Sequence, residues 1–517
     1  MKHQYCVPAP ALIQMKLPGA GSDVRAIHDW KRSLRPATAD CNMGFIQRRA
    51  EIPMTDDAQQ TRNNAAEQLE ALFAWTVDAA RKPLPETVRR RAALILADDI
   101  GAIVAGSREP QVVAARRRFL DASSASVEAT VFAEHAPRGD RNAVACANGM
   151  AITWCELDEG FRLASCHGGA YTLPALLAEA ESRDLETSEV VRALAIAYEF
   201  TTRIALAYPF PGFYVHPHAA FATIGAAVAA SIVRGHSVET MRSAVTGAAS
   251  MSFAGPFDTA VEGSLVRNAW TAAGAWIGMQ ACDWAEAGIG GGIHTIHDVF
   301  AASFRTRMRP DALTQGLGEV WSVASGYHKV FACCNYAHAA VEACLALRER
   351  LDGRSVSAIR EIVVEAGPSG LALSAVEPQT VLSAKFSMPH AVAATTLLGT
   401  GGAAAFTYET LSDPEIAALR RRVSLVPCAE AGPPPRDRPA RVGWRFDDGT
   451  VLTEFVASPK GGADQPFDEP TLLAKLEENT GMFFPQAGAV LRSIVEGGAT
   501  ENTSRWRETV ARIVASA

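Results

Sequence analysis

Helical patterns follow one another along the chain from about residue 65 to about residue 320, with hardly a strand candidate between them. The segment 85–106 is typical, because it opens with proline, closes with glycine and places apolar side chains on one face, at Val88, Ala92, Leu94, Ile95 and Ile100. Small residues dominate the helical segments that follow, and small side chains allow helices to pack closely. This succession predicts a large all-helical domain.

The pattern changes after about residue 325, where IREIVVEAG, RRVSLVPC and ARVGWRFDDGTVLTEFVAS are typical of strands, the last of a hairpin with DDG at its turn. The Pro-rich segment EAGPPPRDRP is typical of an ordinary loop, and helical patterns return after about residue 462. We therefore predict a mainly α protein, with a helical domain at 64–325 plus 463–517 and a smaller inserted α+β domain at 326–462. Residues 1–63 have no sustained period and predict a poorly ordered N-terminal extension.

Composition limits the partners of the protein. The 517 residues are 48% hydrophobic and 20% charged and carry a formal charge of −7, which gives a pI near 6.0. Such a chain has no general attraction for nucleic acid, so a small anionic substrate would need a local group of basic side chains. We expect a soluble, cytoplasmic protein with no membrane partner for three reasons. The ten cysteines are scattered, an apolar signal segment is lacking, and the apolar run 219–233 is too short to span a membrane.

Five short stretches concentrate groups that can perform chemistry. ELDEGFRLASCHGG contains Asp158, Glu159 and His167. The other four hold His216 and His218 at a helix start, Arg267 and Asn268 at another, His328, Lys329, Tyr336 and His338 in GYHKVFACCNYAH, and Lys385, Ser387 and His390 in SAKFSMPHAVA. A helix start favours an anion, an arginine can hold a carboxylate with two N–H groups, and a histidine can exchange a proton near neutral pH.

Each stretch also has an ordinary structural interpretation, which these residues by themselves leave open. Histidines such as His216 and His218 often cap or pack a helix, and Asp158 and Glu159 are compatible with a solvated loop. Lys329, next to apolar residues, is compatible with a lysine that keeps only its ammonium in water.

Metal and cofactor signals are weak in this sequence. His294 and His297 have the i, i+3 spacing of two metal ligands, but no third ligand is evident nearby. The glycine-rich stretch AGIGGGIH has isoleucine at position 293, where a dinucleotide fingerprint needs glycine. We expect no metal and no cofactor.

Taken in order, these pieces resemble the MmgE/PrpD family, which includes 2-methylcitrate dehydratase, cis-aconitate decarboxylase and iminodisuccinate epimerase. The resemblance runs from about residue 65 to 480, through DDIGAIVAG, ELDEGFRLASCHGG, AYEFTTRI, HPHAAFATIGAA, EGSLVRNAW, HKVFACCNYAHAAVEACLAL, AKFSMPHAVA and DPEIAALRRRVSLVP. It implies that the α+β domain is a lid and that the protein is a homodimer. It also implies a cofactor-free site in the cleft between the domains, with a small di- or tricarboxylate as substrate.

The resemblance implies particular site residues as well. The acidic stretch that ends in a histidine corresponds to Asp158, Glu159 and His167. The histidine that enters the long helix corresponds to His216, and a lysine about nine residues before another histidine corresponds to Lys329 and His338.

Several positions depart from the family pattern. Gly168 stands where proline usually follows the histidine, Phe161 stands where related bacterial sequences often have asparagine, and Asn268 replaces the lysine of the dehydratase's basic pair. The second active-site lysine of the decarboxylase falls near Glu262 or Gly263, and its tyrosine falls on Met388. The last two losses argue against decarboxylation.

Removal of a proton α to a carboxylate needs cations where charge develops, a base and an acid. We predict Arg267 and Lys329 as the cations and His167 and His216 as the base and acid, with Asp158 orienting one imidazole. The predicted substrate-binding residues are Arg267, Asn268, Glu159, His338 and His218. The predicted activity is that of a hydro-lyase similar to 2-methylcitrate dehydratase, and the alternatives are a dicarboxylate epimerase and a catalytically silent homologue that binds a carboxylate.

Overall fold

The computed structural model describes residues 56–498 and 503–515, and the chain from Asp56 onward forms one compact unit. Helix α2 (Asp56–Ala79) begins inside the N-terminal extension that we predicted, so residues 56–63 are helical and the prediction is wrong for them. Residues 1–55 of that extension lie outside the described part of the chain. Within this part, no helix has both the length and the hydrophobicity needed to cross a membrane.

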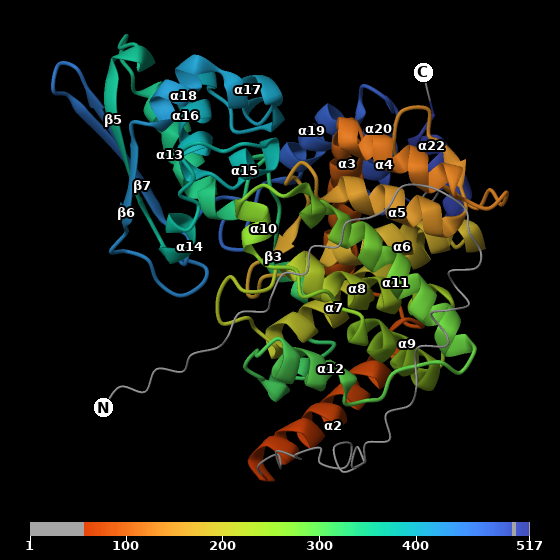
Figure 1. Cartoon of the computed structure of the whole chain (residues 1–517). Coiled ribbons are helices and arrows are strands. Elements are labelled where there is room, and N and C mark those ends of the chain that lie inside the picture. The colour runs from red at the N-terminus through yellow and green to blue at the C-terminus, as the bar shows by residue number, and fades with distance from the viewer. Residues whose placement is uncertain (1–55, 499–502, 516–517) are drawn as a thin grey trace, which may run out of the picture. The chain divides into compact units, whose positions relative to one another are not determined.

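Helices make up most of the molecule (Figure 1), as the sequence predicted. Before the sheet they are α3 (Glu86–Gly106), α4 (Pro110–Asp121), α5 (Arg141–Ile152), α6 (Gly168–Arg183), α7 (Thr187–Ala207), α8 (Pro217–Val233), α9 (Val238–Ser250), α10 (Asp258–Val261), α11 (Ala269–Glu286) and α12 (Thr295–His297). The apolar helix α8 lies among α6, α7, α9 and α11. A Cβ at Gly278 of α11 would lie 2.5 Å from Cβ of Ala226 on α8, so small residues do set the close approach of these helices.

A four-stranded sheet forms the second part of the fold, with the strand order β6-β5-β7-β8. The strands are β5 (Ile359–Ala366), β6 (Val423–Pro427), β7 (Ala440–Phe446) and β8 (Val451–Val456), and only the pair β5 and β6 is parallel. Helices α13 (His338–Glu349), α16 (Met388–Leu398) and α18 (Pro414–Arg420) lie on one side of it. The alternating residues of β7, Val442, Trp444 and Phe446, are buried, as expected for a sheet covered on one face.

The C-terminal helices return to the first helices of the chain. Helices α19 (Glu469–Thr480) and α20 (Ala487–Glu496) pack against α3, and α22 (Trp506–Ile513) packs against α20 (Figure 1). A mainly α fold with a small α+β part is thus confirmed, while the domain boundaries given above stay a prediction.

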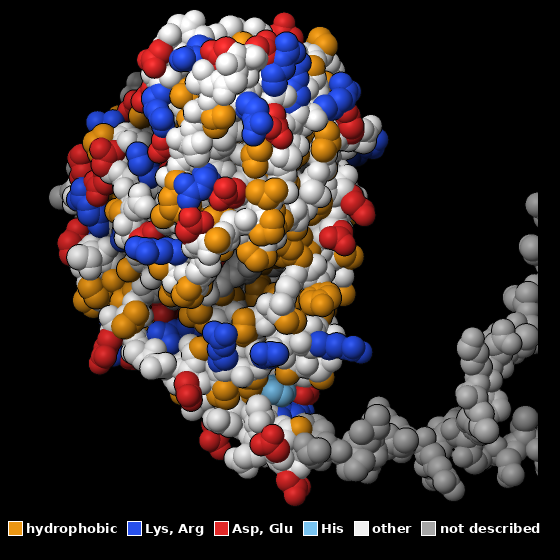
Figure 2. Space-filling model, turned by 90° about the vertical axis from the view of Figure 1, so that its left-hand side faces the viewer, with side chains coloured by type: hydrophobic (Ala, Val, Ile, Leu, Met, Phe, Trp, Pro, Cys, Tyr) orange, Lys and Arg blue, Asp and Glu red, His pale blue; other side chains and the backbone are white. Residues whose placement is uncertain are grey.

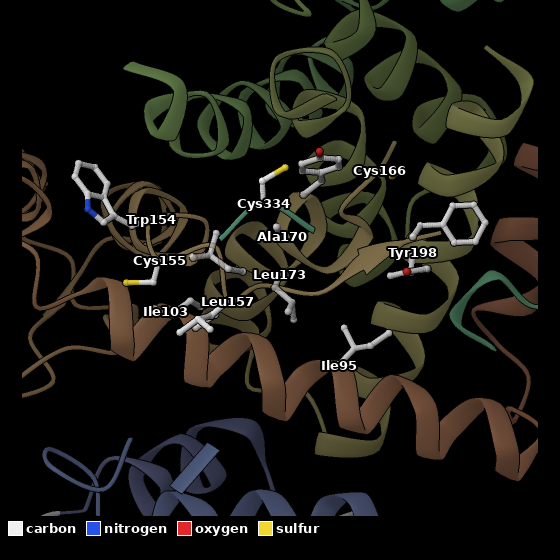
Figure 3. Close-up of a cluster of buried hydrophobic side chains, with 14 of the residues drawn as sticks. Ile95, Ile103, Trp154, Cys155, Leu157, Cys166, Ala170, Leu173, Tyr198 and Cys334 are labelled. Atoms are coloured by element: carbon white, nitrogen blue, oxygen red, sulfur yellow. The ribbon is translucent and has the colours of Figure 1, made fainter. Parts of the chain in front are cut away.

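A layer of buried hydrophobic side chains supports the acidic stretch that the sequence analysis singled out. Figure 3 shows Ile95 and Ile103 projecting from α3 towards Leu157 and towards Leu173 of α6. Leu157 lies between the acidic residues in sequence and is only 4% exposed. Its burial anchors the stretch, which fixes the direction of the charged side chains beside it.

One face of the molecule is concave. Figure 2 shows a hollow near the middle of that face, with hydrophobic side chains gathered around it. Concave surfaces of this kind are where small-molecule sites usually lie.

Candidate active site

A cavity of about 490 Å³, including its open mouth, lies where several segments of the chain meet. Four predicted site residues lie on its wall, namely His167, His216, Arg267 and Lys329. The wall also includes side chains that we did not predict as site residues, among them Glu156, Tyr327, Asn335, Tyr336 and Arg438.

A short strand pairing joins two distant parts of this wall. Strand β3 (Gly160–Phe161) pairs antiparallel with β4 (Gly326–Tyr327), with Gly160 opposite Tyr327. A Cβ at position 160 would lie 2.4 Å from the ring of Tyr327, so this approach requires glycine. The pairing places the acidic stretch before β3 next to Lys329, which follows β4.

Lys329 lies between two carboxylates of the acidic stretch. Its Nζ is 3.2 Å from Oδ1 of Asp158 and 3.5 Å from Oε2 of Glu156, and all three side chains are buried. Burial alone would raise the pKa of both carboxyls. The charge of Lys329 nevertheless lowers the pKa of Asp158 below its ordinary value, and the charges of Arg267 and Lys329 do the same for Glu156. Burial would lower the pKa of Lys329, but the two carboxylates raise it. The lysine is therefore an ammonium between two carboxylates.

Glu156 has a backbone conformation that is costly for a residue with a side chain. Its φ is 55°, in the left-handed region, which costs roughly 1–2 kcal/mol outside glycine. Its carboxylate forms ion pairs with Nη2 of Arg267 and with Lys329. These contacts offset the strain and hold Glu156 on the cavity wall.

Arg267 is fully engaged within the protein. Nη1 donates to the carbonyl oxygen of Thr153 at 3.1 Å and to Oδ1 of Asn268 at 2.8 Å, and Nη2 pairs with Glu156. The carboxylate held by this guanidinium is thus Glu156 of the chain itself. Asn268 orients Arg267 and does not line the cavity, so a substrate contact by either residue stays a prediction.

His167 and Asp158 form a hydrogen-bonded pair. Nδ1 of His167 is 2.7 Å from Oδ2 of Asp158 and 2.8 Å from the carbonyl oxygen of Glu159. Because both partners can only accept while Asp158 is ionised, Nδ1 carries the ring proton, and a neutral His167 has its lone pair on Nε2. Since His167 lines the cavity, this is the arrangement of a general base with an orienting carboxylate.

His216 is held as a neutral imidazole. It is the residue before helix α8, its Nδ1 accepts a hydrogen bond from the N–H of His218 at 3.2 Å, and Nε of Arg267 points at its Nε2 from 3.4 Å. A donor near each ring nitrogen disfavours the imidazolium, and burial followed by the charge of Arg267 places the pKa of His216 well below its ordinary value. The arrangement thus favours neutral His216, and its predicted pairing with His167 as base and acid stays a prediction.

His218 and Glu159 lie behind the cavity wall. Nδ1 of His218 is 2.8 Å from the hydroxyl of Tyr171. Oε1 of Glu159 accepts from the N–H of Gly169, and Oε2 accepts from Tyr198 at 2.9 Å. Burial raises the pKa of Glu159 to about 8. Neither side chain lines the cavity, so their predicted contact with substrate is not supported by this arrangement.

Comparison with known proteins identifies the chain's family. The model of the MmgE/PrpD N-terminal domain matches residues 70–305, and the model of the MmgE/PrpD C-terminal domain matches residues 331–497. The chain belongs to the MmgE/PrpD family.

Two relatives in this family are similar over most of their length. Cis-aconitate decarboxylase-like protein oryM of Aspergillus oryzae is 25% identical over 425 residues, which are 77% of this chain and 86% of that protein. Cis-aconitate decarboxylase of Aspergillus terreus is 23% identical over 444 residues, 78% of this chain and 86% of that protein. The family and these relatives support a lyase-type enzyme, and at such identities they leave its particular reaction open.

The structure gives a physical reason for one departure from the MmgE/PrpD pattern. A Cβ at Gly168 would lie 2.4 Å from the ring of Tyr198, so a larger residue after His167 has no space. Glu262, Gly263 and Met388 do not line the cavity, and Met388 is fully buried. These three positions, at which the lysine and the tyrosine of the decarboxylase are missing, therefore lie outside the wall of this MmgE/PrpD site.

Other predicted groups of this MmgE/PrpD protein are buried away from the cavity. Nε2 of His338 is 3.1 Å from the carbonyl oxygen of Cys333, and burial lowers the pKa of His338 to about 3. Nζ of Lys385 donates to the carbonyl oxygen of Trp154 at 2.8 Å, and Nε2 of His390 is 3.0 Å from that of Ala405. None of the three side chains lines the cavity, and the predicted contact of His338 with substrate stays a prediction.

Arg438 is the most consequential residue that the sequence analysis missed. It lies in the Pro-rich segment between β6 and β7, which we took for an ordinary loop. Its guanidinium carbon lies 4.5 Å from the centre of the Tyr336 ring, and Nη1 bonds Oδ1 of Asn335. The available signal was chemical: an anionic substrate needs basic residues, and this segment holds two arginines.

One group of possible metal ligands occurs in the described part of the site. Single ligand atoms of Asp158, His167 and His218 lie within 4.8 Å of one another. Because Asp158 already bonds His167 and the Lys329 ammonium, a cation there would meet a fixed positive charge. This donor set fits a metal poorly, and the expected lack of a metal or cofactor stays a prediction.

Proposed function

We propose that this MmgE/PrpD protein is a cofactor-independent hydro-lyase that removes a proton α to a carboxylate of a small di- or tricarboxylate. The observation that carries the proposal is the bond between Asp158 and His167 at the wall of a cavity lined by cations. A base whose proton-bearing nitrogen is fixed by a carboxylate is suited to accept a proton at its other nitrogen.

In the proposed first step, Nε2 of His167 takes the α proton of the substrate. The imidazolium that forms lies 2.7 Å from Asp158, whose negative charge stabilises it. The electron pair left on carbon spreads into the substrate carboxylate. Lys329 keeps one of its three N–H groups for that carboxylate, since the other two bond Asp158 and Glu156.

In the second step, the same imidazolium returns its proton to the hydroxyl on the neighbouring carbon. The C–O bond breaks, water leaves, a carbon–carbon double bond forms, and His167 is neutral again. One histidine thus serves as base and then as acid. An epimerase needs a second proton donor on the opposite face, and the donors around both ring nitrogens of His216 make that residue ill suited to the role. This consideration favours elimination over epimerisation.

Decarboxylation is the second candidate, because both named relatives are described as cis-aconitate decarboxylase or as similar to it. In that reaction the carbon–carbon bond to one carboxylate breaks, CO₂ leaves, and an acid protonates the remaining carbon. The cations of the cavity would serve that reaction as well. The homodimer and the cytoplasmic location expected from the sequence stay predictions.

Nuclear magnetic resonance in deuterated water tests the proposal and separates its alternatives. The wild type would be incubated with citrate, 2-methylcitrate, malate and cis-aconitate. Deuterium at an α carbon together with vinyl signals supports a hydro-lyase, exchange with inversion alone supports an epimerase, and release of CO₂ supports a decarboxylase.

The matched variants are His167→Gln in the cavity wall and His135→Gln, whose side chain is 88% exposed. We expect exchange to be lost in the first variant and retained in the second. Exchange that survives His167→Gln would refute the role proposed for this histidine. Binding of a polycarboxylate without exchange by the wild type would favour the silent homologue.

A further inference from the structure

A second pocket adjoins the cavity. It has a volume of about 600 Å³, its open mouth included, and three residues, Ser165, Tyr336 and Arg438, line both spaces. Its remaining wall combines Arg162 with the aromatic side chains of Phe210 and Phe221. The site therefore continues past Arg438 into a space that is partly cationic and partly apolar.

Arg438 is buried and rigidly held at this junction. Its guanidinium lies over the rings of Tyr336 and Tyr327, with centre distances of 4.5 and 5.6 Å. Nη1 bonds Asn335, and Nε donates to Asp437 at 3.2 Å. Among the described residues, Nη2 of Arg438 makes no hydrogen bond, although the side chain is only 7% exposed. Unlike Nε of Arg162, Nη2 of Arg438 is not fully buried, and the residue lines both spaces, so this nitrogen can donate to an acceptor that enters there.

Arg162 adds a second positive charge next to that of Arg438. Its Nη1 donates to Oδ1 of Asn335 at 3.3 Å, and its Nη2 lies 3.2 Å from Oδ1 of Asp437. Nε of Arg162 is buried and makes no hydrogen bond. Among the described residues, these two guanidiniums form ion pairs with one carboxylate, that of Asp437, so positive charge is in excess at this junction.

The other half of the cavity is electrically balanced. Arg267 and Lys329 face Glu156 and Asp158, so two cations meet two carboxylates. The surplus positive charge of the cavity therefore lies at Arg438 and Arg162, away from the balanced side. An anionic group that enters will be drawn to that surplus.

We propose that Arg438, supported by Arg162, binds the second carboxylate of the substrate, the one remote from the carbon that loses its proton. The ligand class is a dicarboxylate or tricarboxylate. The planar guanidinium offers its free Nη2 to that carboxylate, and the rings of Tyr327 and Tyr336 keep it in place. This inference deepens the proposed function and rests on it for the identity of the reacting carbon, but it concerns binding and can be tested without turnover.

The test compares full-length wild type, Arg438→Gln and Arg436→Gln by calorimetric titration with succinate and with succinamide, its uncharged diamide. Arg436 is an exposed arginine two residues away on the same segment, so it is the matched control. We expect Arg438→Gln to weaken succinate binding by about 10- to 100-fold. Binding of succinamide, which has no carboxylate, should hardly change, and Arg436→Gln should resemble the wild type for both ligands.

If Arg438→Gln weakens the binding of succinate and of succinamide equally, Arg438 only holds the loop in place and the inference is overturned. A wild type that binds the two ligands equally well would overturn it too. If Arg438→Gln proves poorly folded by circular dichroism, Arg438→Lys keeps the charge, and we expect it to keep the preference for succinate.

The two proposals fail separately. Preference for succinate that depends on Arg438, with no deuterium exchange on any substrate, would refute the hydro-lyase and leave this subsite standing. Where exchange does occur, Arg438→Gln should raise KM for the exchanging substrate with little change in kcat. An unchanged KM would refute the subsite alone.

Discussion

Nζ of Lys475, on a helix near the C-terminus, donates a 2.7 Å hydrogen bond to the carbonyl oxygen of Leu157 in the acidic stretch. The same ammonium lies 2.6 Å from Oδ1 of Asp98, whose Oδ2 is 2.8 Å from Nδ1 of His328. Leu157 precedes Asp158, and His328 precedes Lys329. This buried network therefore supports both partners of the ion pair between Asp158 and Lys329. Lys475 and Leu157, which it joins, are more than 300 residues apart in sequence.

We expect Lys475→Met to destabilise the protein strongly, because it leaves Asp98 buried without its main cation and the Leu157 carbonyl without a donor. Removal of one partner of a buried ion pair costs about 3–5 kcal/mol. Urea denaturation measures the change in the free energy of unfolding. Lys82→Met is the control, since Lys82 forms an ion pair with Asp78 while its side chain is 64% exposed, and such pairs contribute about 0–1 kcal/mol. Equal effects of the two substitutions would contradict the role of the network.

Asp158→Asn should reduce turnover far more than it reduces substrate binding. The asparagine amide can donate to Nδ1 of His167, which moves the ring proton to Nε2 and removes the lone pair that accepts the substrate proton. We expect kcat to fall by about 10³- to 10⁴-fold, by analogy with the orienting carboxylate of serine proteases. Asp121→Asn, at an exposed position, is the control. A fall confined to KM would show that Asp158 binds substrate and does not orient the base.

Glu159→Gln should change how stability depends on pH. Burial raises the folded-state pKa of Glu159 to about 8 from its ordinary value of 4.5. A raised pKa means that the contribution of this group is fully present below the unfolded-state pKa and is lost as the pH rises through the folded-state pKa. Between pH 5 and 8 the wild type should therefore lose stability relative to Glu159→Gln, by up to about 1.4 kcal/mol per pH unit.

Denaturation midpoints of the two proteins at several pH values check this prediction. Glu67→Gln, at an exposed position of α2, should run parallel to the wild type across the same range. If Glu159→Gln also runs parallel to the wild type, then Glu159 is ionised in the folded protein near neutral pH.

Gly168→Ala should destabilise the protein through its contact with Tyr198. The new Cβ would lie 2.4 Å from the ring, and overpacking of this kind costs about 1–3 kcal/mol. In a chain that also carries Tyr198→Leu, the cost should fall, because the smaller side chain leaves room. A double-mutant cycle of unfolding free energies measures this coupling. Gly443→Ala, where the nearest atom lies 3.8 Å from the added Cβ, is the control.

The elements of the fold were accessible from the sequence because their signals are local. The helix pattern at 85–106 became α3 at Glu86–Gly106, and the alternation around Trp444 became β7. Residues 56–63 were misassigned, because a polar segment such as DDAQQTRNN carries no apolar face of its own. This segment is helical because it forms the first turns of the longer helix α2, whose buried side chains lie further along the chain, from Ala65 to Val77.

The candidate site was only partly accessible from the sequence. His167, Lys329 and Asp158 could be selected because they are chemically capable residues in short, dense stretches. Arg438 could not, because nothing in a Pro-rich segment says which cavity it will reach.

By itself the sequence determined the mainly helical class, the strand-forming region and the family, because periodicity and residue order are properties of the chain. It also determined which groups can carry charge or move protons. Only the tertiary structure decided how these groups pair. Arg267 and Lys329 are balanced by Glu156 and Asp158, His216 is kept neutral, and the surplus positive charge falls on Arg438. The physical reason is that charge and proton affinity depend on distances of a few ångströms and on burial, and folding sets both between residues far apart in sequence.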